Sequence, residues 1–513
     1  MQDRSGLATR SLEMPSLNSA SWCNLLAVIG YLGSATVALC APASGNTSCC
    51  QSLTAALSSK VVYPDSAAYN ASVSSYWAQG EQLLSPSCIV SPQAAQDVSA
   101  AIKILVAGSC KFAVRGGGHG SVTGIANIED GVTLDLRGIN FTTISNDGTS
   151  VAVGAGQLLG NAYSILYKRG LYIPTARAAS IGAGGSTIGG GLGYLYPKTG
   201  FAVDSVVEFE VVLANGTIVS ATKSVNSDLW RALKGGGSNF GVVTKIVYTT
   251  YPLGDVWGGD VVYPVSSIDA ELRAFYNFAA NPSYDDNAAV MMNFHWSPTD
   301  GNILDNQYIY AKPVVAPPAF AEFYTIPNQI FNSTAVTNIP ALSAAQSARS
   351  PAGLQEITFA VSFRNNVDVL KDVFNLYNAS ITKLSDVEGI SLSLSFEPLM
   401  QLLAAKAKAT GGNVLGVDPP AEGVVLTLLS LTFTDADDYS TLSKFSQKLL
   451  SDIIAAAKKR GASNSFIDMN HAGASQKVLA SYGSDNYAFL KATAKKYDPS
   501  AVFQKLLPGG FKL

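Results

Sequence analysis

The sequence predicts an α+β protein with a strand-and-helix first half and a second half dominated by long strands. From about residue 85 to 255, short apolar strands alternate with helices and glycine-rich turns. After residue 255, long strand-like segments are interspersed with helices, which is typical of an antiparallel sheet with helices over one face. With 513 residues, 47% of them hydrophobic, the chain can form two interlocked domains with large cores.

The first half is expected to alternate strands and helices in a fixed order. Apolar residues at three- and four-residue spacing predict a helix over 92–105, and a second helix over 161–170 ends at a glycine. Residues 204–221 are expected to form a hairpin, because Asn215-Gly216 is a turn pair that hairpins prefer. The remaining expected strands are 111–114, 131–136, 150–156 and 240–253.

The second half contains the strand-like segments DVWGGDVVYPV, NAAVMMNFHWSP, NQYIYAKPVV, EITFAVSFR and GVVLTLLSLTFT, with a helix over 369–384. The last stretch is expected to be a helix, a turn at Asp498-Pro499 and a tail. The change in character predicts one domain over 85–255 and another over 256–459. We expect residues 460–513 to return to the first domain.

The amino-terminal residues have the pattern of a targeting segment. Arg4 and Arg10 precede the apolar stretch of residues 22–43, in which Ala41-Pro42-Ala43 offers small residues at a cleavage spacing. A signal anchor that stays in the membrane is the alternative, but Gly30 and Gly33 interrupt the apolar run. We therefore expect residues 1–43 to be a cleaved signal peptide. The mature protein would be secreted or lumenal, without stable membrane association.

The cysteine positions agree with export. Cys49, Cys50, Cys88 and Cys110 would remain after cleavage, and adjacent cysteines do not readily bond to each other. Cys49 and Cys50 are each expected to pair with Cys88 or Cys110, which would tie residues 44–84 to the first domain. The sequence has no CxxC pair of the kind that binds zinc, so we expect no metal site. Sequons occur at Asn46, Asn70, Asn140, Asn215, Asn332 and Asn378.

Charge argues against a nucleic-acid partner. The chain has 34 Lys+Arg and 37 Asp+Glu, a formal net charge of −3, and no basic cluster interleaved with aromatic residues.

Four glycine clusters mark the first half: RGGGHG (115–120), GAGQLLG (154–160), GAGGSTIGGGLG (182–193) and KGGGSNFG (234–241). Glycine-rich turns can direct consecutive backbone N–H groups at a pyrophosphate. Ordinary tight turns are the alternative for each cluster, but four in one half favour a shared nucleotide ligand. The spacing of GAGQLLG does not fit a Rossmann fingerprint, and no GxxxxGK[ST] P-loop occurs.

The first glycine cluster and the strand after it resemble a segment of a known enzyme family. VRGGGHG (114–120) followed by GVTLDLRGIN (131–140) resembles the flavin-attachment segment of the berberine-bridge-enzyme-like oxidases, in the vanillyl-alcohol-oxidase superfamily. The likeness continues through 200–216, 228–246 and 482–510. It implies a PCMH-type FAD-binding domain of two α+β subdomains plus a substrate domain. It also implies that His119 is bonded covalently to the 8α-methyl carbon of the flavin, a plain structural histidine being the alternative.

The resemblance implies a set of cofactor-binding positions. Many relatives carry a second, cysteinyl link, and the corresponding residue here is Ala178, whose methyl group cannot form a thioether. We therefore expect FAD to be held by one bond, through His119. The expected cofactor-binding residues are His119, Arg115, Gly116, Gly117, Gly118, Gly120, Ala178, Ser180, Gly185, Ser186, Gly189, Gly190, Gly193, Val206 and Asn470.

The catalytic base is expected near the carboxyl terminus. In SFIDMNHAG (465–473), Asp468 and His471 replace aromatic residues of the family pattern, which argues against a tyrosine base. Asp468 is an acceptable base if partly desolvated, and a turn-capping aspartate is the alternative. Glu397 is a weaker candidate for the base. Tyr482 is a further candidate, and a purely structural role in core packing is its alternative.

The sequence thus predicts an FAD-linked oxidoreductase that takes hydride from a small organic substrate, such as a secondary metabolite, with O2 as acceptor. Two alternatives stay open. One is a flavoprotein that assists a non-redox cyclisation. The other is an oligosaccharide oxidase, in which Trp230, Trp257 and Trp296 would stack on sugars.

Overall fold

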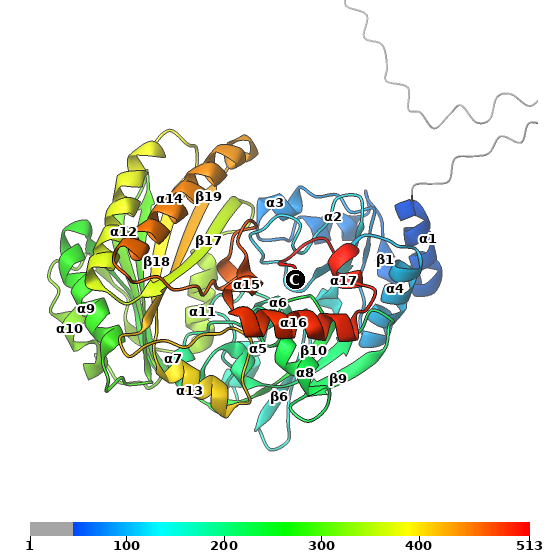
Figure 1. Ribbon diagram of the computed structural model, residues 1–513, viewed down its shortest axis with the longest axis horizontal. Coiled ribbons are helices and arrows are strands. Elements are labelled where there is room, and N and C mark those ends of the chain that lie inside the picture. Colours follow the sequence, from blue (N-terminus) through cyan, green and yellow to red (C-terminus); the bar gives the residue numbers. More distant parts are fainter. Residues whose placement is uncertain (1–44) are drawn as a thin grey trace, which may run out of the picture. The chain divides into compact units, whose positions relative to one another are not determined.

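The computed structural model describes residues 45–513, which belong to one compact unit (Figure 1). The expected signal peptide, residues 1–43, lies outside the described residues. The predicted α+β class is confirmed: residues 45–513 form a four-stranded, a five-stranded and a two-stranded sheet (β7 with β11) besides an eight-stranded antiparallel sheet. The domain boundaries expected from the sequence stay a prediction.

The first sheet contains the strand that leads into the glycine turn of residues 115–120. Its four strands have the order β1-β2-β4-β3, and β2, β4 and β3 run parallel to one another. Buried side chains of α1 and α4 pack against it. The elements are α1 (Gly45–Leu57), β1 (Val61–Val62), β2 (Cys88–Val90), α4 (Ala95–Ala107), β3 (Phe112–Arg115) and β4 (Val132–Asp135).

The second sheet is antiparallel and has the order β5-β6-β10-β8-β9. Its core includes Val153, Phe209, Ile246 and Tyr248, all fully buried. The elements are β5 (Thr142–Ile144), β6 (Ser150–Gly154), α5 (Leu159–Tyr167), α6 (Ala183–Ile188), β8 (Val206–Val212), β9 (Ile218–Thr222), α8 (Ser227–Leu233) and β10 (Val242–Thr249).

The β8–β9 hairpin differs in detail from the expectation. Leu213 N–H donates to the Thr217 carbonyl at 2.9 Å, and only Gly216 of the pair Asn215-Gly216 has positive φ, at 78°. A two-residue type I′ turn needs positive φ at both central residues. The connection is therefore a three-residue loop with Gly216 in the left-handed position.

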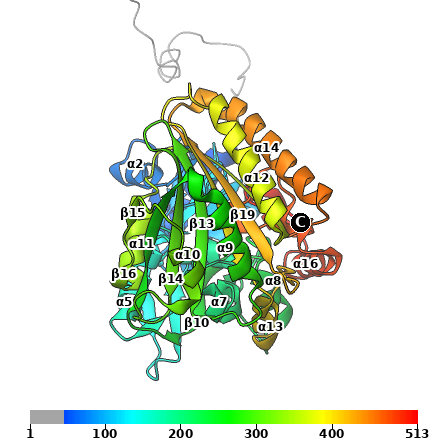
Figure 2. The same ribbon diagram turned by 90° about the vertical axis from the view of Figure 1, so that its left-hand side faces the viewer.

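The eight-stranded sheet has the order β15-β12-β14-β13-β18-β19-β17, with β16 also paired to β12. Helices α9, α12 and α14 cover one of its faces (Figure 2). The elements are β12 (Val256–Pro264), α9 (Ile268–Ala280), β13 (Ala288–Ser297), β14 (Gly301–Tyr310), β15 (Phe331–Asn332), β16 (Ala335–Thr337), β17 (Gln355–Arg364), α12 (Val367–Ser380), β18 (Ser391–Leu399), β19 (Val424–Phe433) and α14 (Tyr439–Lys459).

Alternation along these strands divides the sheet into two faces. Phe294 on β13 and Phe396 on β18 lie in the core beneath the helices, with ring centroids 5.0 Å apart. The neighbouring residues Thr358, Glu397 and Leu428 have the opposite parity and face the first half of the chain. Within residues 45–513, no helix combines the length and apolarity needed to cross a bilayer.

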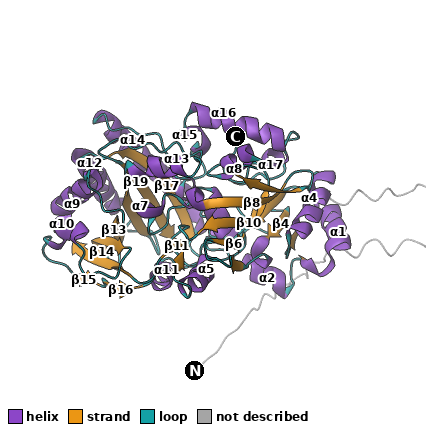
Figure 3. Cartoon of the chain, turned by 90° about the horizontal axis from the view of Figure 1, so that it is seen from below, coloured by secondary structure: helices purple, strands orange, loops and turns teal. Residues whose placement is uncertain are grey.

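The carboxyl-terminal residues contact the first half of the chain (Figure 3). Helix α16 (Ser484–Tyr497) packs on α8, and the Phe112 N–H of β3 donates to the Leu506 carbonyl at 2.8 Å. The other short elements are α2 (Ala67–Val73), α3 (Gln79–Gln82), β7 (Leu171–Tyr172), α7 (Tyr196–Thr199), β11 (Tyr251–Pro252), α10 (Ala321–Tyr324), α11 (Ile339–Ala348), α13 (Leu402–Ala409), α15 (Val478–Ser481) and α17 (Val502–Lys505).

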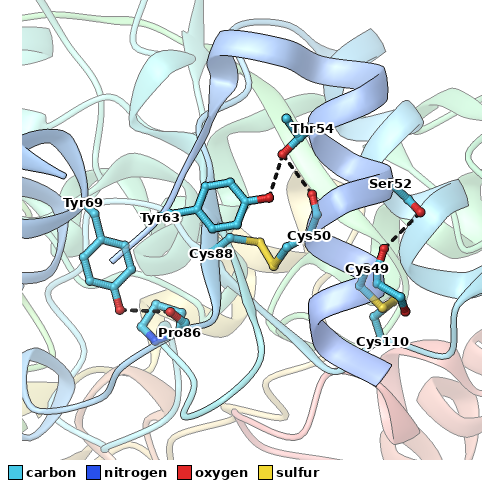
Figure 4. The surroundings of a disulfide bond; sticks show 10 residues. Cys49, Cys50, Ser52, Thr54, Tyr63, Tyr69, Pro86, Cys88 and Cys110 are labelled. Carbon is cyan, nitrogen blue, oxygen red and sulfur yellow. Dashed lines mark hydrogen bonds between the residues drawn. A yellow bond between two sulfur atoms is a disulfide. The ribbon is translucent and has the colours of Figure 1, made fainter. Parts of the chain in front are cut away.

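Two disulfides hold α1 to the first sheet, and they resolve the pairing that the sequence left open. Cys49 bonds to Cys110 after α4, and Cys50 bonds to Cys88 at the start of β2 (Figure 4). All four cysteines are buried. Two adjacent residues of α1 therefore bond this helix to the segment after α4 and to the start of β2.

Removing the Cys50–Cys88 bond should destabilise the protein. The bond closes a loop with a sequence separation of 38. The loss of this constraint on the unfolded chain corresponds to about 4 kcal/mol for a loop of that length. We expect the Cys50→Ser/Cys88→Ser variant to have a clearly lower urea midpoint than the wild type. An unchanged midpoint would show that the bond is dispensable for the fold.

Candidate functional site

The glycine clusters meet where two backbone segments cross without side chains between them. A Cβ on Gly117 would lie 2.5 Å from the Gly182 backbone nitrogen, and a Cβ on Gly182 would lie 2.3 Å from the Gly117 nitrogen. Both distances are too short for any side chain. Glycine is therefore required at both positions, because the turn after β3 and the turn before α6 touch through their backbones.

The other clusters join this crossing. A Cβ on Gly184 would lie 2.7 Å from the Ala155 carbonyl, which brings in the second cluster. The Gly237 N–H donates to the Ile188 carbonyl at 3.0 Å, which brings in the fourth. A Cβ on Gly189 would lie 2.2 Å from the Asn470 side-chain oxygen. The four glycine clusters, which are far apart in the sequence, thus meet with Asn470 at one site that is lined mainly by backbone atoms.

His119 presents its imidazole at this site. The ring is partly exposed and stacks on Trp77, with ring centroids 4.3 Å apart and planes at 8°. Its nitrogens have no hydrogen-bond partner among residues 45–513. Burial, with the nearby charge of His471, lowers the pKa of His119 to about 4. The ring is therefore neutral at neutral pH and has a free lone pair, as a nucleophilic nitrogen requires.

Trp77 is a functional candidate that the sequence did not reveal. Its N–H donates to the Gly118 carbonyl at 2.9 Å, and its indole Nε1–H donates to the Ser350 carbonyl at 3.1 Å. These bonds hold the indole flat against His119 from the segment before β2. No motif surrounds Trp77 in the sequence, so only its tertiary contacts identify it.

Arg115 is directed into the protein. Its guanidinium donates to the Ser72 carbonyl at 2.7 Å and the Ser75 carbonyl at 2.9 Å, and lies 3.7 Å from the centre of the Tyr76 ring. The side chain is fully buried and also lies 3.8 Å from Asp135. Arg115 therefore stabilises the start of the glycine turn, and any cofactor contact of this residue would come from its backbone.

The other expected cofactor residues lie on or beside the converging turns. Gly185 has open space where a Cβ would point, with nothing within 4 Å. The Asn470 amide donates to the Ser186 carbonyl at 2.9 Å. Ala178 and Val206 are buried, and the Ser180 N–H donates to Ser347 at 3.0 Å. The remaining expected residues, all backbone positions in the first and third clusters, are Gly116, Gly118, Gly120, Gly190 and Gly193.

The expected base Asp468 is buried and paired. Its Oδ2 lies 2.6 Å from His471 Nδ1, and only 3% of the Asp468 side chain is exposed, against 37% for His471. Tyr482 is also buried, stacks on Phe466, and has a hydroxyl without a hydrogen-bond partner among the described residues. Burial, followed by the charge of Asp468, raises the pKa of Tyr482 well above its usual value. Tyr482 therefore stays protonated.

Glu397 forms a buried ion pair instead of facing open space. Both of its oxygens accept hydrogen bonds from Arg177, at 2.6 and 2.7 Å. Arg177 directly precedes Ala178, and Glu397 belongs to β18, so the pair connects the third glycine cluster to the eight-stranded sheet. Burial opposes the charge of Arg177, but the partner Glu397 raises the arginine pKa above its ordinary value. This geometry favours a structural role.

The tryptophans considered for sugar stacking are core residues. Trp230 is 4% exposed and donates to the Val206 carbonyl at 3.2 Å. Trp257 is 2% exposed beside Phe320 and Tyr324, and Trp296 is 9% exposed in the core under the helices. With these exposures none of the three rings offers an open stacking surface, which argues against the sugar-stacking alternative.

The arrangement fits a flavin dinucleotide. Backbone-lined turns give a large planar and anionic group close access, Gly185 borders open space, and His119 offers an unpaired nitrogen. The residues that would hold it are those of the converging turns, with His119 among them.

Comparisons with known proteins agree with this geometry. Residues 86–222 match the family described as FAD binding domain. The chain is 32% identical to FAD-dependent monooxygenase sdcF of Emericella nidulans, over 91% of its own length and 98% of that protein. It is 34% identical over 88% of its length to Oligopeptidase PhomG' of Diaporthe leptostromiformis, of which it spans only 36%.

Solved structures share the fold. The xylooligosaccharide oxidase of Myceliophthora thermophila C1 superposes with a TM-score of 0.72 at 18% identity, covering 91% of this chain and 99% of that one. The glucooligosaccharide oxidase of Acremonium strictum gives a TM-score of 0.72 at 17% identity, covering 89% and 97%.

Removing the Trp77 ring should impair the placement of His119. We expect Trp77→Ala to keep the fold but to carry a smaller fraction of acid-stable flavin, because the imidazole loses its stacking partner. Trp77→Phe should retain most of it. The ratio of flavin to protein absorbance after acid precipitation measures this. Equal ratios in the wild type and Trp77→Ala would contradict the positioning role.

Breaking the Arg177–Glu397 pair should destabilise the protein strongly. Glu397→Gln leaves Arg177, whose side chain is only 13% exposed, without its partner charge, which costs about 3–5 kcal/mol. Thermal unfolding should show a lower melting temperature. The double variant Arg177→Met/Glu397→Leu, which removes both charges, should recover much of the loss. A Glu397→Gln variant with normal stability but no activity would instead favour a catalytic role.

Proposed function

Because the chain belongs to the berberine-bridge-enzyme-like family of FAD-dependent oxidoreductases, we propose that it oxidises a small organic substrate with an FAD held covalently by His119. The observation that supports this most is the neutral, unpaired imidazole at the point where the glycine clusters converge. When bound, FAD supplies a hydride acceptor. The chain itself binds and orients the substrate, excludes water and accepts a proton.

The proposed attachment is a single bond. The glucooligosaccharide oxidase of Acremonium strictum carries a 6-S-cysteinyl, 8α-N1-histidyl FAD. In this chain His119 offers the imidazole, whereas the position that the family resemblance assigns to cysteine is Ala178, which is 5% exposed. A methyl group forms no bond to the ring. The flavin would therefore be attached at one point only.

We propose a metabolite-type substrate and O2 as the electron acceptor, with hydrogen peroxide as the second product. The sequence relative sdcF is named a monooxygenase, so transfer of one oxygen atom to the product is the competing outcome. The two differ in the fate of O2. Isotopically heavy O2 leaves its label in peroxide for an oxidase and in the organic product for a monooxygenase.

We also propose that the protein is exported. Two disulfides in the described residues support it, since such bonds persist in oxidising compartments.

Substitution of His119 tests the attachment. After acid precipitation, the wild-type pellet should stay yellow, because a covalent flavin survives denaturation. His119→Ala should give a colourless pellet while still binding FAD reversibly. His295→Ala, which alters a histidine on β13, is the matched control and should resemble the wild type. A wild-type pellet that releases all its colour would contradict the covalent link.

A substrate screen tests the reaction. Anaerobic bleaching of the enzyme flavin by benzyl alcohol, compared with bleaching by xylobiose, separates a metabolite-type alcohol from a sugar. We expect faster bleaching by the aromatic alcohol, because no tryptophan among Trp230, Trp257 and Trp296 is available to stack on a sugar. Faster bleaching by xylobiose would favour the oligosaccharide alternative.

A further inference from the structure

The pair Asp468–His471 is arranged as a carboxylate that orients an imidazole. Asp468 Oδ2 lies 2.6 Å from His471 Nδ1, and the carboxylate is the buried member of the pair. With Nδ1–H donating to Asp468, Nε2 is the ring nitrogen left to accept a proton. That nitrogen has no hydrogen-bond partner among the described residues. The solvent-accessible member of the pair is therefore the histidine.

The turn that carries the pair is fixed on both sides. On one side, Asn470 donates to the Ser186 carbonyl beside the third glycine cluster at 2.9 Å. On the other side, Gln476 accepts from the Gly473 N–H at 2.9 Å and the Ala360 N–H at 3.0 Å. These contacts hold residues 468–471 between α6 and β17. The turn that carries the His471 imidazole is therefore held in place by hydrogen bonds on both sides.

His471 and His119 approach the same residue of β17. A Cβ on Gly473 would lie 2.6 Å from the Thr358 carbonyl, so the turn after His471 touches Thr358. Ser121, two residues after His119, shares a 2.7 Å hydrogen bond with the Thr358 hydroxyl. The two histidine turns therefore lie side by side against one strand. The influence of His471 on the His119 pKa agrees with this proximity.

We propose that His471 is the base of the reaction and that Asp468 is its positioning residue. This inference rests on the proposed function. The substrate class is an alcohol or amine with an oxidisable C–H bond beside its O–H or N–H group. His471 Nε2 would accept the proton of that O–H or N–H group, and the electron pair of the broken O–H or N–H bond would form the second bond of C=O or C=N. The C–H bond at the same carbon would then give its hydrogen with both electrons to a bound flavin, which supplies the hydride acceptor. In this balance one proton would pass to His471, and one hydride, which is a proton with two electrons, would be accepted by FAD.

The other expected bases are less suitable. Tyr482 is buried against Phe466, and its hydroxyl stays protonated. Both carboxylate oxygens of Glu397 accept hydrogen bonds from the terminal guanidinium nitrogens of Arg177. Asp468 is 3% exposed, and its Oδ2 is paired with His471. This assignment explains why aspartate and histidine occur together, three residues apart, in one turn.

Acylation by diethyl pyrocarbonate tests the free nitrogen directly, because this reagent attacks an unprotonated and accessible imidazole nitrogen. In holoenzyme, peptide mass analysis should find His471 acylated at least tenfold faster than His295. The latter is the matched His–Asp pair: its Nε2 lies 3.2 Å from Asp300 and its Nδ1 lies 3.0 Å from Ser393. Asp468→Asn should slow acylation of His471. No acylation of His471, or a rate that Asp468→Asn leaves unchanged, overturns the proposal.

Flavin bleaching by benzyl alcohol tests the catalytic role. General base catalysis contributes about 10²- to 10⁴-fold, so His471→Gln should slow bleaching by at least 100-fold. The acid-precipitated pellet of this variant should stay yellow. His295→Gln should bleach at the wild-type rate. A His471→Gln variant that bleaches as fast as the wild type overturns the assignment.

The two proposals fail in different ways. If the flavin attachment is wrong, the wild-type pellet is colourless, whereas acylation of His471 still depends on Asp468. If the base assignment is wrong, the pellet is yellow and the wild type and His471→Gln bleach alike.

Discussion

The contact between Gly117 and Gly182 is the constraint on which the site depends. Two backbone segments approach so closely that neither residue can carry a Cβ, with projected distances of 2.5 and 2.3 Å to backbone nitrogens. This contact fixes the turn after β3 against the turn before α6. His119 lies in the first turn and Ser186 lies in α6 just after the second, so their relative position results from the crossing. A larger residue at either place would separate the two turns.

Around this crossing, segments from the whole chain complete the site. Trp77 comes from the segment before the first sheet, Asn470 and His471 come from the carboxyl-terminal part, and Thr358 comes from the eight-stranded sheet. The Arg177–Glu397 pair connects the same glycine cluster to that sheet. The site is therefore a product of the tertiary fold, and the disulfides and buried ion pair that stabilise the fold also stabilise the site.

Much of the fold follows from local patterns in the sequence. The periodicity of 92–105 predicted α4 to within a few residues, and the long strand-like segments of the second half correspond to β13, β17 and β19. The hairpin at Asn215-Gly216 was predicted, but its loop is one residue longer than a type I′ turn, because only Gly216 has positive φ. The cysteine pairing could not be predicted, since it depends on how α1 lies against α4 and β2.

The site was predictable only where a residue type is required by a local motif. His119 stands out within its glycine run, and the family resemblance indicated its role. Trp77 has no such motif and depends on contacts with Gly118 and Ser350. Trp230, Trp257 and Trp296 were candidates because tryptophan is a common ligand platform, but their burial depends on packing that the sequence does not show. For Asp468, the sequence identified the turn, and the structure identified the imidazole it orients.

The most direct measurement of the proposed attachment is peptide mapping of the purified holoenzyme by mass spectrometry. We expect a mass increment of one FAD on the peptide that contains His119 and on no other. An increment on a peptide containing His295 or His471, or no flavinylated peptide from yellow protein, would contradict it.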